Sequence, residues 1–114
     1  MSDCIFCKII NGDIPCSMVY QDETVLAFKD INPLAPVHVL VVSKQHIESA
    51  QALNESNSQI AAHIFSKIPG IAKELGIAES GYRVITNIGK DGGQAVPHLH
   101  FHILGGRKLE NALG

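Results

Sequence analysis

Residues 98–104, His-Leu-His-Phe-His-Ile-Leu, alternate polar and apolar side chains almost to the end of the stretch. A period of two is typical of a β-strand, because successive side chains point to opposite faces of a sheet. The stretch therefore predicts a strand with three histidines on one face and Leu99, Phe101 and Ile103 on the other. Next-but-one residues of a strand lie roughly 6.5–7 Å apart, so neighbouring imidazoles can serve one site.

The remaining pattern predicts a single α+β domain over residues 1–114. Turn signals and apolar spacing predict a short helix at 6–10, strands at 18–21, 25–29, 37–42 and 82–87, and a long helix at 54–75 capped by Asn54 and ended by Gly76. Pro69 should kink or split that helix. Short turns between consecutive strands favour an antiparallel sheet. Residues 37–42 are apolar on both faces, which predicts a central strand.

Composition narrows the possible functions. The chain has 114 residues, 46% of them hydrophobic, and a net charge of −2 without runs of like charge. This favours a globular domain and argues against a nucleic-acid-binding or membrane-binding protein. No signal peptide is visible at the first residues, so we expect a cytoplasmic protein.

Three histidines on one strand face allow three interpretations. They could be a merely packed or solvated face, ligands of a metal such as zinc, or a nucleophilic site that transfers phosphoryl groups without a metal. Imidazole titrates near pH 6.5, so it can be neutral and nucleophilic near neutrality. The preceding loop, residues 89–96, is rich in glycine, and glycine lets backbone N–H groups approach an anion closely. A glycine loop that leads into three alternating histidines favours the phosphoryl-transfer interpretation.

Cys4 and Cys7 form a second pattern, Cys-x-x-Cys. Taken alone, this spacing suits a redox pair, half of a zinc site, or chance. Cys16 and His63 have no partners that the sequence identifies, and we interpret them as incidental and as helix surface.

The sequence resembles the histidine-triad (HIT) superfamily. The resemblance rests on Asp-Gly-Gly-Gln at 91–94 and His-Leu-His-Phe-His-Ile-Leu-Gly-Gly-Arg at 98–107. The ending Leu-Gly-Gly-Arg and the segment Gly-Tyr-Arg at 81–83 resemble the Hint branch, the purine nucleoside phosphoramidases. Segments at 4–10, 26–33 and 35–38 resemble other blocks of the same branch, so the resemblance covers nearly the whole chain.

This resemblance implies a fold, an assembly and a reaction. The fold would be a five-stranded antiparallel sheet with one long and one short helix, which dimerises into a ten-stranded sheet. The long helix and the strand at 82–87 would lie at the interface, and the tail at 108–114 would lie near the partner's site. His100 would attack the α-phosphorus of a nucleoside 5′-phosphoramidate, of the adenosine 5′-monophosphoramidate type, and form a covalent nucleotidyl-histidine that water releases. No catalytic metal is expected.

The resemblance also implies roles for single residues. The catalytic set would be His100, with His102 on the α-phosphate oxygens, His38 against the same site, and His98. The nucleotide-binding set would comprise Asp30 on the ribose, an apolar base slot, and phosphate contacts from a side chain and the loop backbone: Phe6, Phe28, Asp30, Ile31, Asn87, Gly93, Gln94, Ala95, Val96, His100 and His102. Ala95 stands where some Hint proteins have a serine that is thought to hydrogen-bond the leaving group, so the substrate preference is open.

Some HIT relatives hold a structural zinc ion, and the matching positions here are Cys4, Cys7, His46 and His98. Zinc at this place would remove His98 from acid–base chemistry. Two other functions stay open beside the phosphoramidase: a dinucleoside polyphosphate hydrolase with the same nucleophile, and a nucleotide-binding interaction module with vestigial activity. In each case the small-molecule partner would be a purine nucleotide.

Overall fold

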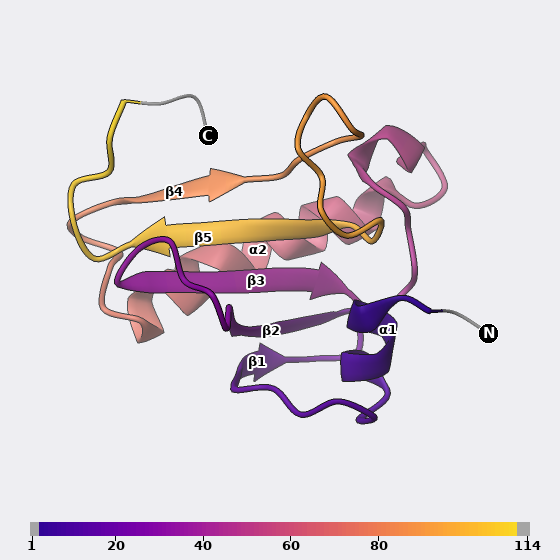
Figure 1. Ribbon diagram of the computed structural model, residues 1–114, viewed down its shortest axis with the longest axis horizontal. Helices are drawn as coiled ribbons and strands as arrows, with labels where there is room; N and C mark the ends of the chain where they lie inside the picture. The colour runs from indigo at the N-terminus through magenta and orange to yellow at the C-terminus, as the bar shows by residue number, and fades with distance from the viewer. Residues whose placement is uncertain (1–2, 112–114) are drawn as a thin grey trace.

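Five strands form one antiparallel sheet in the order β1-β2-β3-β5-β4 in the computed structural model, which describes residues 3–111 (Figure 1). The strands are β1 (Met18–Gln21), β2 (Val25–Lys29), β3 (Val37–Ser43), β4 (Tyr82–Ile85) and β5 (His100–Gly105). The prediction of a central strand over residues 37–42 is confirmed, because β3 is the middle strand of the five. The α+β class and the five-stranded antiparallel sheet are confirmed as well.

The two faces of the sheet bury different clusters of apolar side chains. Val39 and Val41 of β3 point into a core beneath the long helix, together with Phe101 of β5. Leu40 and Val42, one residue out of step, pack against Phe6 on the opposite face. Successive side chains of β3 therefore point to opposite faces of the sheet, as the period of two in a strand requires.

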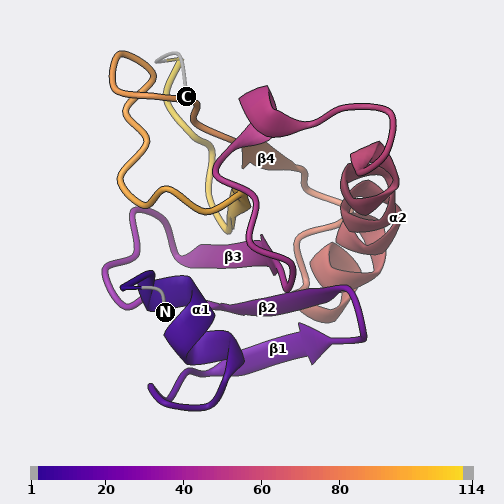
Figure 2. The ribbon, with the colours of Figure 1, turned by 90° about the vertical axis from the view of Figure 1, so that its right-hand side faces the viewer.

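One helix covers each face (Figure 2). Helix α2 (Ser58–Glu74) buries an apolar stripe, which consists of Ile60, Ile64, Ile68, Ile71 and Ala72. These residues recur at three- and four-residue steps, so one side of the helix meets the sheet. The much shorter α1 (Ile5–Ile10) lies on the other face and buries Phe6. A single-turn 3₁₀ helix, η1 (Ala50–Ala52), precedes α2.

Two predicted boundaries are wrong, and one of the two outcomes expected at Pro69 does not occur. Helix α2 begins at Ser58 and not at Asn54, because Asn54 caps a separate turn by accepting the Ser56 N–H at 2.8 Å. Pro69 lies inside α2 without splitting it. Strand β4 ends at Ile85, two residues before the predicted end.

Strand β5 starts at His100, so His98 precedes the strand instead of opening it. The His98 N–H donates to the Val96 carbonyl at 2.8 Å across Pro97. Such a three-residue turn needs a central φ near −75°, which the proline ring supplies. His98 nevertheless lies on the same face as His100, because the ring of Phe6 contacts both.

Candidate active site and cysteine–histidine cluster

Three histidines meet on the α1 face of the sheet, on the neighbouring strands β3 and β5. Leu40 pairs with His102 and Val42 with His100, which brings His38 diagonally beside His102. The Nε2 atom of His38 lies 3.0 Å from Nδ1 of His102. The rings of His100 and His102 lie 5.1 Å apart. The two strands therefore place all three imidazoles in one row.

Hydrogen bonds determine which nitrogen of each ring carries the proton. The Leu34 N–H donates to Nδ1 of His38 at 3.1 Å, so a neutral His38 carries its proton on Nε2. That Nε2–H donates to Nδ1 of His102, which leaves the proton of His102 on its own Nε2. The Nε2–H of His102 can therefore donate to a group other than His38.

His100 has the opposite tautomer. Its Nδ1–H donates to the backbone carbonyl of His98 at 2.6 Å. A neutral imidazole with its proton on Nδ1 keeps a lone pair on Nε2. The ring is buried but lines a cavity, so this lone pair belongs to a nucleophile that a ligand can reach.

The surroundings keep these imidazoles neutral. Burial lowers the pKa of His100, against its hydrogen bond to the His98 carbonyl and the charge of Asp30. Burial also lowers the pKa of His38, opposed by Asp30, whose Oδ2 lies 3.5 Å from His38 Nε2. The pKa of His102 falls to about 4, because burial and the neighbouring His100 and His38 all disfavour its cation. Uncharged rings near neutral pH are what a histidine nucleophile requires.

A cavity of about 590 Å³ lies over this row. Its walls come from β3, β4, β5, the glycine loop and the segment after β5, and comprise Leu34, His38, Arg83, Ile85, Asn87, Gly93, Ala95, His100, His102, Leu104, Arg107, Leu109 and Glu110. Its volume is typical of a small-molecule site. The structure therefore brings six of the predicted site residues together in one cavity.

Hydrogen bonds within the glycine loop hold it in place. The Asn87 side chain donates to the Gly92 carbonyl at 2.8 Å, and the side chain of Gln94 donates to the carbonyls of Glu48 and Val96. The N–H groups of Gly93 and Gln94 donate to carbonyls of the same loop. Within residues 3–111, the N–H groups of Ala95 and Val96 have no such carbonyl partner, so both could donate to an anion; Ala95 lines the cavity, whereas Val96 lies outside its lining.

The predicted base and ribose residues lie beside this cavity, outside its lining. Phe6 and Phe28 pack edge to face at 5.8 Å in the apolar cluster under α1. Asp30 approaches His38 from the loop before β3. Ile31 is 89% exposed. An exposed isoleucine and an adjacent half-buried carboxylate form a small amphipathic surface next to the histidine row.

Sequence reasoning missed two arginines in the cavity wall. Arg83 donates to the Glu110 carbonyl at 2.9 Å, and Arg107 donates to the Leu34 carbonyl at 3.3 Å. The signal for Arg83 was available, since Arg83, Ile85 and Asn87 alternate on one face of β4 and its continuation. The part of the tail within 107–110 lines the cavity of its own chain. Residues 112–114 of the predicted partner-facing tail lie outside the described residues.

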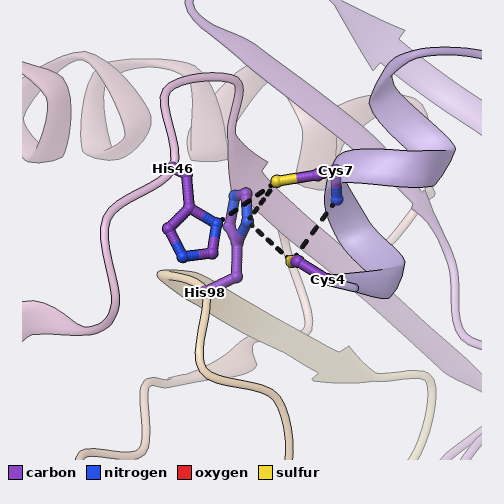
Figure 3. Close-up of side chains that lie close together, drawn as sticks. All are labelled: Cys4, Cys7, His46 and His98. Atoms are coloured by element: carbon purple, nitrogen blue, oxygen red, sulfur yellow. Dashed lines mark hydrogen bonds between the residues drawn. The ribbon is translucent and has the colours of Figure 1, made fainter. Parts of the chain in front are cut away.

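The second constellation joins the N-terminal turn to His46 and to His98 in the segment before β5 (Figure 3). Sγ of Cys4 lies 3.2 Å from Nδ1 of His98, and Sγ of Cys7 lies 3.2 Å from Nδ1 of His46 and 3.6 Å from Nδ1 of His98. All four donor atoms lie within 4.8 Å of one another. The four residues that the resemblance implied are thus together, although 94 positions separate Cys4 from His98.

This donor set fits zinc. Zinc–sulfur bonds of about 2.3 Å and zinc–nitrogen bonds of about 2.0–2.1 Å in a tetrahedron put the donors roughly 3.3–3.8 Å apart. The separations between thiol and imidazole atoms are close to that range. Nε2–H of His98 donates to the Ser43 carbonyl at 2.6 Å, which leaves the Nδ1 lone pair facing the sulfurs. A metal-binding histidine typically donates its other nitrogen in this way.

His98 therefore differs from the other two triad histidines. Its ring is fully buried and does not line the cavity. Its ring belongs to the cysteine–histidine cluster, and its carbonyl accepts the proton of His100. Of its two predicted roles, the arrangement supports the metal ligand over an acid or base.

Asp30, His38 and His102 also offer three donor atoms close together. Nδ1 of His38 already accepts the Leu34 N–H, so a metal at Nε2 would require His38 to lose both ring protons. The three residues are better described as a hydrogen-bonded relay.

His63 is not merely helix surface. Its Nε2 lies 2.7 Å from Oδ2 of Asp22, so it joins α2 to the β1–β2 turn. Cys16 is exposed. Within residues 3–111, no helix is both long and apolar enough to cross a membrane.

Comparisons with known proteins agree with this geometry. The sequence model of the HIT domain family matches residues 11–109 of this chain. An uncharacterised HIT-like protein of Helicobacter pylori is 49% identical over 104 residues, which cover 91% of this chain and 97% of the relative. One from Rickettsia prowazekii is 45% identical over 106 residues, 92% of this chain and 88% of the relative.

Two solved structures are similar over almost the full chain. A HIT family hydrolase from Clostridium thermocellum has 50% identity and a TM-score of 0.95, covering 99% of this chain and 98% of that one. A histidine triad protein from Clostridium difficile has 53% identity, the same TM-score and the same coverage. With its histidine row, its five-stranded sheet and its zinc-type Cys-x-x-Cys cluster, the chain belongs to the HIT family.

Proposed function

We propose that the protein hydrolyses a nucleoside 5′-phosphoramidate to the nucleoside monophosphate through a covalent nucleotide on His100. One observation carries the proposal: the hydrogen bond from His100 Nδ1 to the His98 carbonyl leaves a lone pair on Nε2 at the wall of a ligand-sized cavity. The similarity to a protein described as a HIT family hydrolase supports a hydrolytic reaction.

The reaction would have two displacements. Nε2 of His100 attacks the α-phosphorus, a nitrogen–phosphorus bond forms, and the bond to the leaving amine breaks with its electron pair on the amine. The amine takes a proton from solvent, because Ala95 has no side-chain proton to give and both ring nitrogens of His98 are engaged. Water then attacks the phosphorus, releases a proton, and returns the electron pair to Nε2 as the monophosphate leaves.

Neighbouring groups would stabilise the charge that develops on the phosphoryl oxygens. The Nε2–H of His102 is an N–H donor of fixed tautomer, and Ala95, whose amide we assign to the phosphate, lines the same cavity, with Val96 next to it in the chain. Donors held in advance where charge develops are usually the largest contribution to such catalysis. In this proposal Gly93, Gln94 and Asn87 hold the loop that supplies these amides.

The nucleoside would extend from the phosphate towards Asp30. The two carboxylate oxygens of Asp30 can accept both ribose hydroxyls. Ile31, with Phe28 and Phe6 behind it, offers the apolar surface on which a purine would pack. A dimer is also part of the proposal, since β4 is an edge strand of the described sheet and Phe65 on α2 is 54% exposed.

One observation favours a dinucleoside polyphosphate as the alternative substrate. Arg83 and Arg107 line the cavity, and two guanidinium groups suit an anionic leaving group better than a small amine. Glu110 in the same wall offsets part of that charge.

The test is a turnover panel with wild-type protein and His100→Ala. Adenosine 5′-monophosphoramidate and diadenosine polyphosphates are compared as substrates, and wild-type protein quenched at alkaline pH is searched by mass spectrometry for a nucleotide on the His100 peptide. We expect preferential phosphoramidate hydrolysis, an adduct on that peptide, and a loss of several orders of magnitude in His100→Ala.

Each other result selects another function. Faster cleavage of the polyphosphates would replace the phosphoramidase with the alternative hydrolase. Nucleotide binding without turnover of either substrate would indicate a binding module. Undiminished hydrolysis by His100→Ala would refute the nucleophile.

A further inference from the structure

His98 connects the cysteine–histidine cluster to the nucleophile. Nδ1 of its ring faces the sulfurs of Cys4 and Cys7, and its Nε2–H donates to the Ser43 carbonyl. Its backbone N–H donates to Val96, and its carbonyl accepts the Nδ1–H of His100 at 2.6 Å. Every polar group of His98 thus has a partner, and the one it offers to the active site is the acceptor that sets the His100 tautomer.

Phe6 forms a second connection. Its ring contacts the His98 ring at a centroid distance of 5.7 Å and the His100 ring at 4.9 Å. Phe6 belongs to α1, a helix of six residues whose N-cap is Cys4. A helix this short is not stable by itself, so its position depends on the packing of Phe6 against the sheet and on the contacts that Cys4 makes at its N-terminus.

From these two connections we propose that Cys4, Cys7 and His46 are positioning residues for His100, which act by fixing His98 and Phe6. With zinc in the cluster, His98 would keep its carbonyl against Nδ1 of His100, and Phe6 would keep its contact with the His100 ring. When the cluster is open, the carbonyl and the helix can move, and His100 divides between its two tautomers. The tautomer with its proton on Nε2 has its lone pair on Nδ1 and none on Nε2, the atom that would attack. The kinetic part of this inference rests on the proposed function, whereas the tautomer part does not.

The competing explanation is a purely fold-stabilising cluster. In that case opening the cluster would lower the unfolding temperature but leave the tautomer of His100 unchanged in the folded protein. The tautomer therefore separates the two explanations, and it can be measured without any substrate.

The main variant is His46→Gln, because His46 is the exposed member of the cluster and its replacement leaves the buried ligands in place. His46→Cys is the rescue variant, since a three-cysteine, one-histidine set also binds zinc. Cys16→Ser is the matched control, because Cys16 is an exposed thiol outside the cluster. Wild-type protein stripped of metal with a chelator provides an unmutated comparison if His46→Gln folds poorly.

Three quantities are measured on each protein: zinc content, the His100 tautomer from long-range ¹H–¹⁵N spectra at fixed neutral pH, and kcat and KM for adenosine 5′-monophosphoramidate. We expect His46→Gln and the stripped protein to show mixed His100 tautomers and a kcat about 10- to 100-fold lower with little change in KM, as for other partners that orient a reactive group through a metal site. His46→Cys and Cys16→Ser should resemble wild type.

The inference is overturned if folded protein without zinc keeps a single Nδ1–H tautomer at His100. It is also overturned if kcat falls equally in Cys16→Ser. If wild-type protein hydrolyses neither adenosine 5′-monophosphoramidate nor the diadenosine polyphosphates, the proposed function fails. The comparison of His100 tautomers still decides this inference.

Discussion

The Nε2 atom of His38 donates its proton to Nδ1 of His102 over 3.0 Å, and this bond gives His102 its tautomer. His38 can do so because its own Nδ1 accepts the Leu34 N–H. His38→Ala should therefore leave His102 in place but free to hold its proton on either nitrogen. A single hydrogen bond is worth about 0.5–1.5 kcal/mol net, which corresponds to about 2- to 12-fold in kcat/KM.

His38→Gln is the informative companion variant, because a glutamine amide can restore a donor to His102. Steady-state kinetics with adenosine 5′-monophosphoramidate should show partial recovery in His38→Gln. Equal losses of kcat/KM in His38→Ala and His38→Gln would contradict the hydrogen-bond relay. His38 would then act only through its packing.

His102 itself should matter more than its partner. His102→Ala removes the N–H that we assign to the phosphoryl oxygens, and loss of one such donor costs about 10²- to 10³-fold in kcat. Nucleotide binding, measured by calorimetry with a nucleoside monophosphate, should weaken much less. A loss of binding that matches the loss of kcat would assign His102 to ground-state binding instead.

The sequence predicted those parts of the fold that depend on local periodicity. The alternation at 98–104 and the apolar stretch at 37–42 give β5 and β3, and they place the histidines on one face. It could not predict that β5 begins only at His100, because that depends on contacts with distant segments: the His98 ring donates to the Ser43 carbonyl, and the Leu99 N–H donates to the Ile47 carbonyl.

Contacts across long separations were harder to predict. The pairing of Asp22 with His63 joins residues 41 positions apart, and neither residue carries a motif. The cysteine–histidine cluster spans a longer separation, yet it was found because its four positions match a known family. Arg107 could not be predicted as a cavity residue, because its partner there is the backbone carbonyl of Leu34, which leaves no trace in the sequence. Arg83 could have been predicted from its alternation with Ile85 and Asn87.

Folding stability should fall in mild acid because the triad histidines are held neutral. The pKa of His102 is about 4 in the folded chain, against about 6.5 in an unfolded one. Between these values the unfolded chain binds more protons, so stability rises with pH through this window and is fully present above about pH 6.5. Urea unfolding at a series of pH values should show a shallower slope in His102→Gln than in wild type. Identical slopes would mean that His102 does not contribute.

Asp22 should stabilise the β1–β2 turn with the same sign of pH dependence as His102, but in a more acidic range of pH. Partial burial raises its pKa, but hydrogen bonds from Tyr20, His63 and the amides of Thr24 and Val25 outweigh this and hold its pKa well below the usual range. Its contribution is therefore present above about pH 3.9 and is lost as pH falls further. Asp22→Asn should cost about 1 kcal/mol of unfolding free energy at neutral pH.

Asp13→Asn is the control for this measurement, since Asp13 is an exposed carboxylate. It should leave the unfolding free energy within about 0.5 kcal/mol of wild type. A loss in Asp13→Asn as large as that in Asp22→Asn would indicate a general effect of charge.

Two glycine-to-alanine changes should affect different properties: Gly92→Ala should lower turnover, and Gly70→Ala should raise stability alone. At Gly92 a Cβ would lie 2.3 Å from the Ile88 carbonyl oxygen, closer than atoms can approach, so Gly92→Ala must deform the loop. The Gly92 carbonyl holds the Asn87 side chain, and the loop supplies the amides of Ala95 and Val96. Phosphoramidate turnover should therefore fall at least tenfold, because misplacement by about 1 Å costs up to about 100-fold.

Gly70 provides the matched comparison. It lies inside α2, where a Cβ would meet nothing within 4 Å. Alanine is preferred to glycine within a helix by about 0.5–1 kcal/mol, so Gly70→Ala should raise the urea midpoint and leave turnover unchanged. Because the same chemical change is made at both places, a loss of turnover in Gly92→Ala alone would assign the effect to the shape of the loop beside His100. Retained turnover in Gly92→Ala would show that the loop backbone can shift without harm to the site.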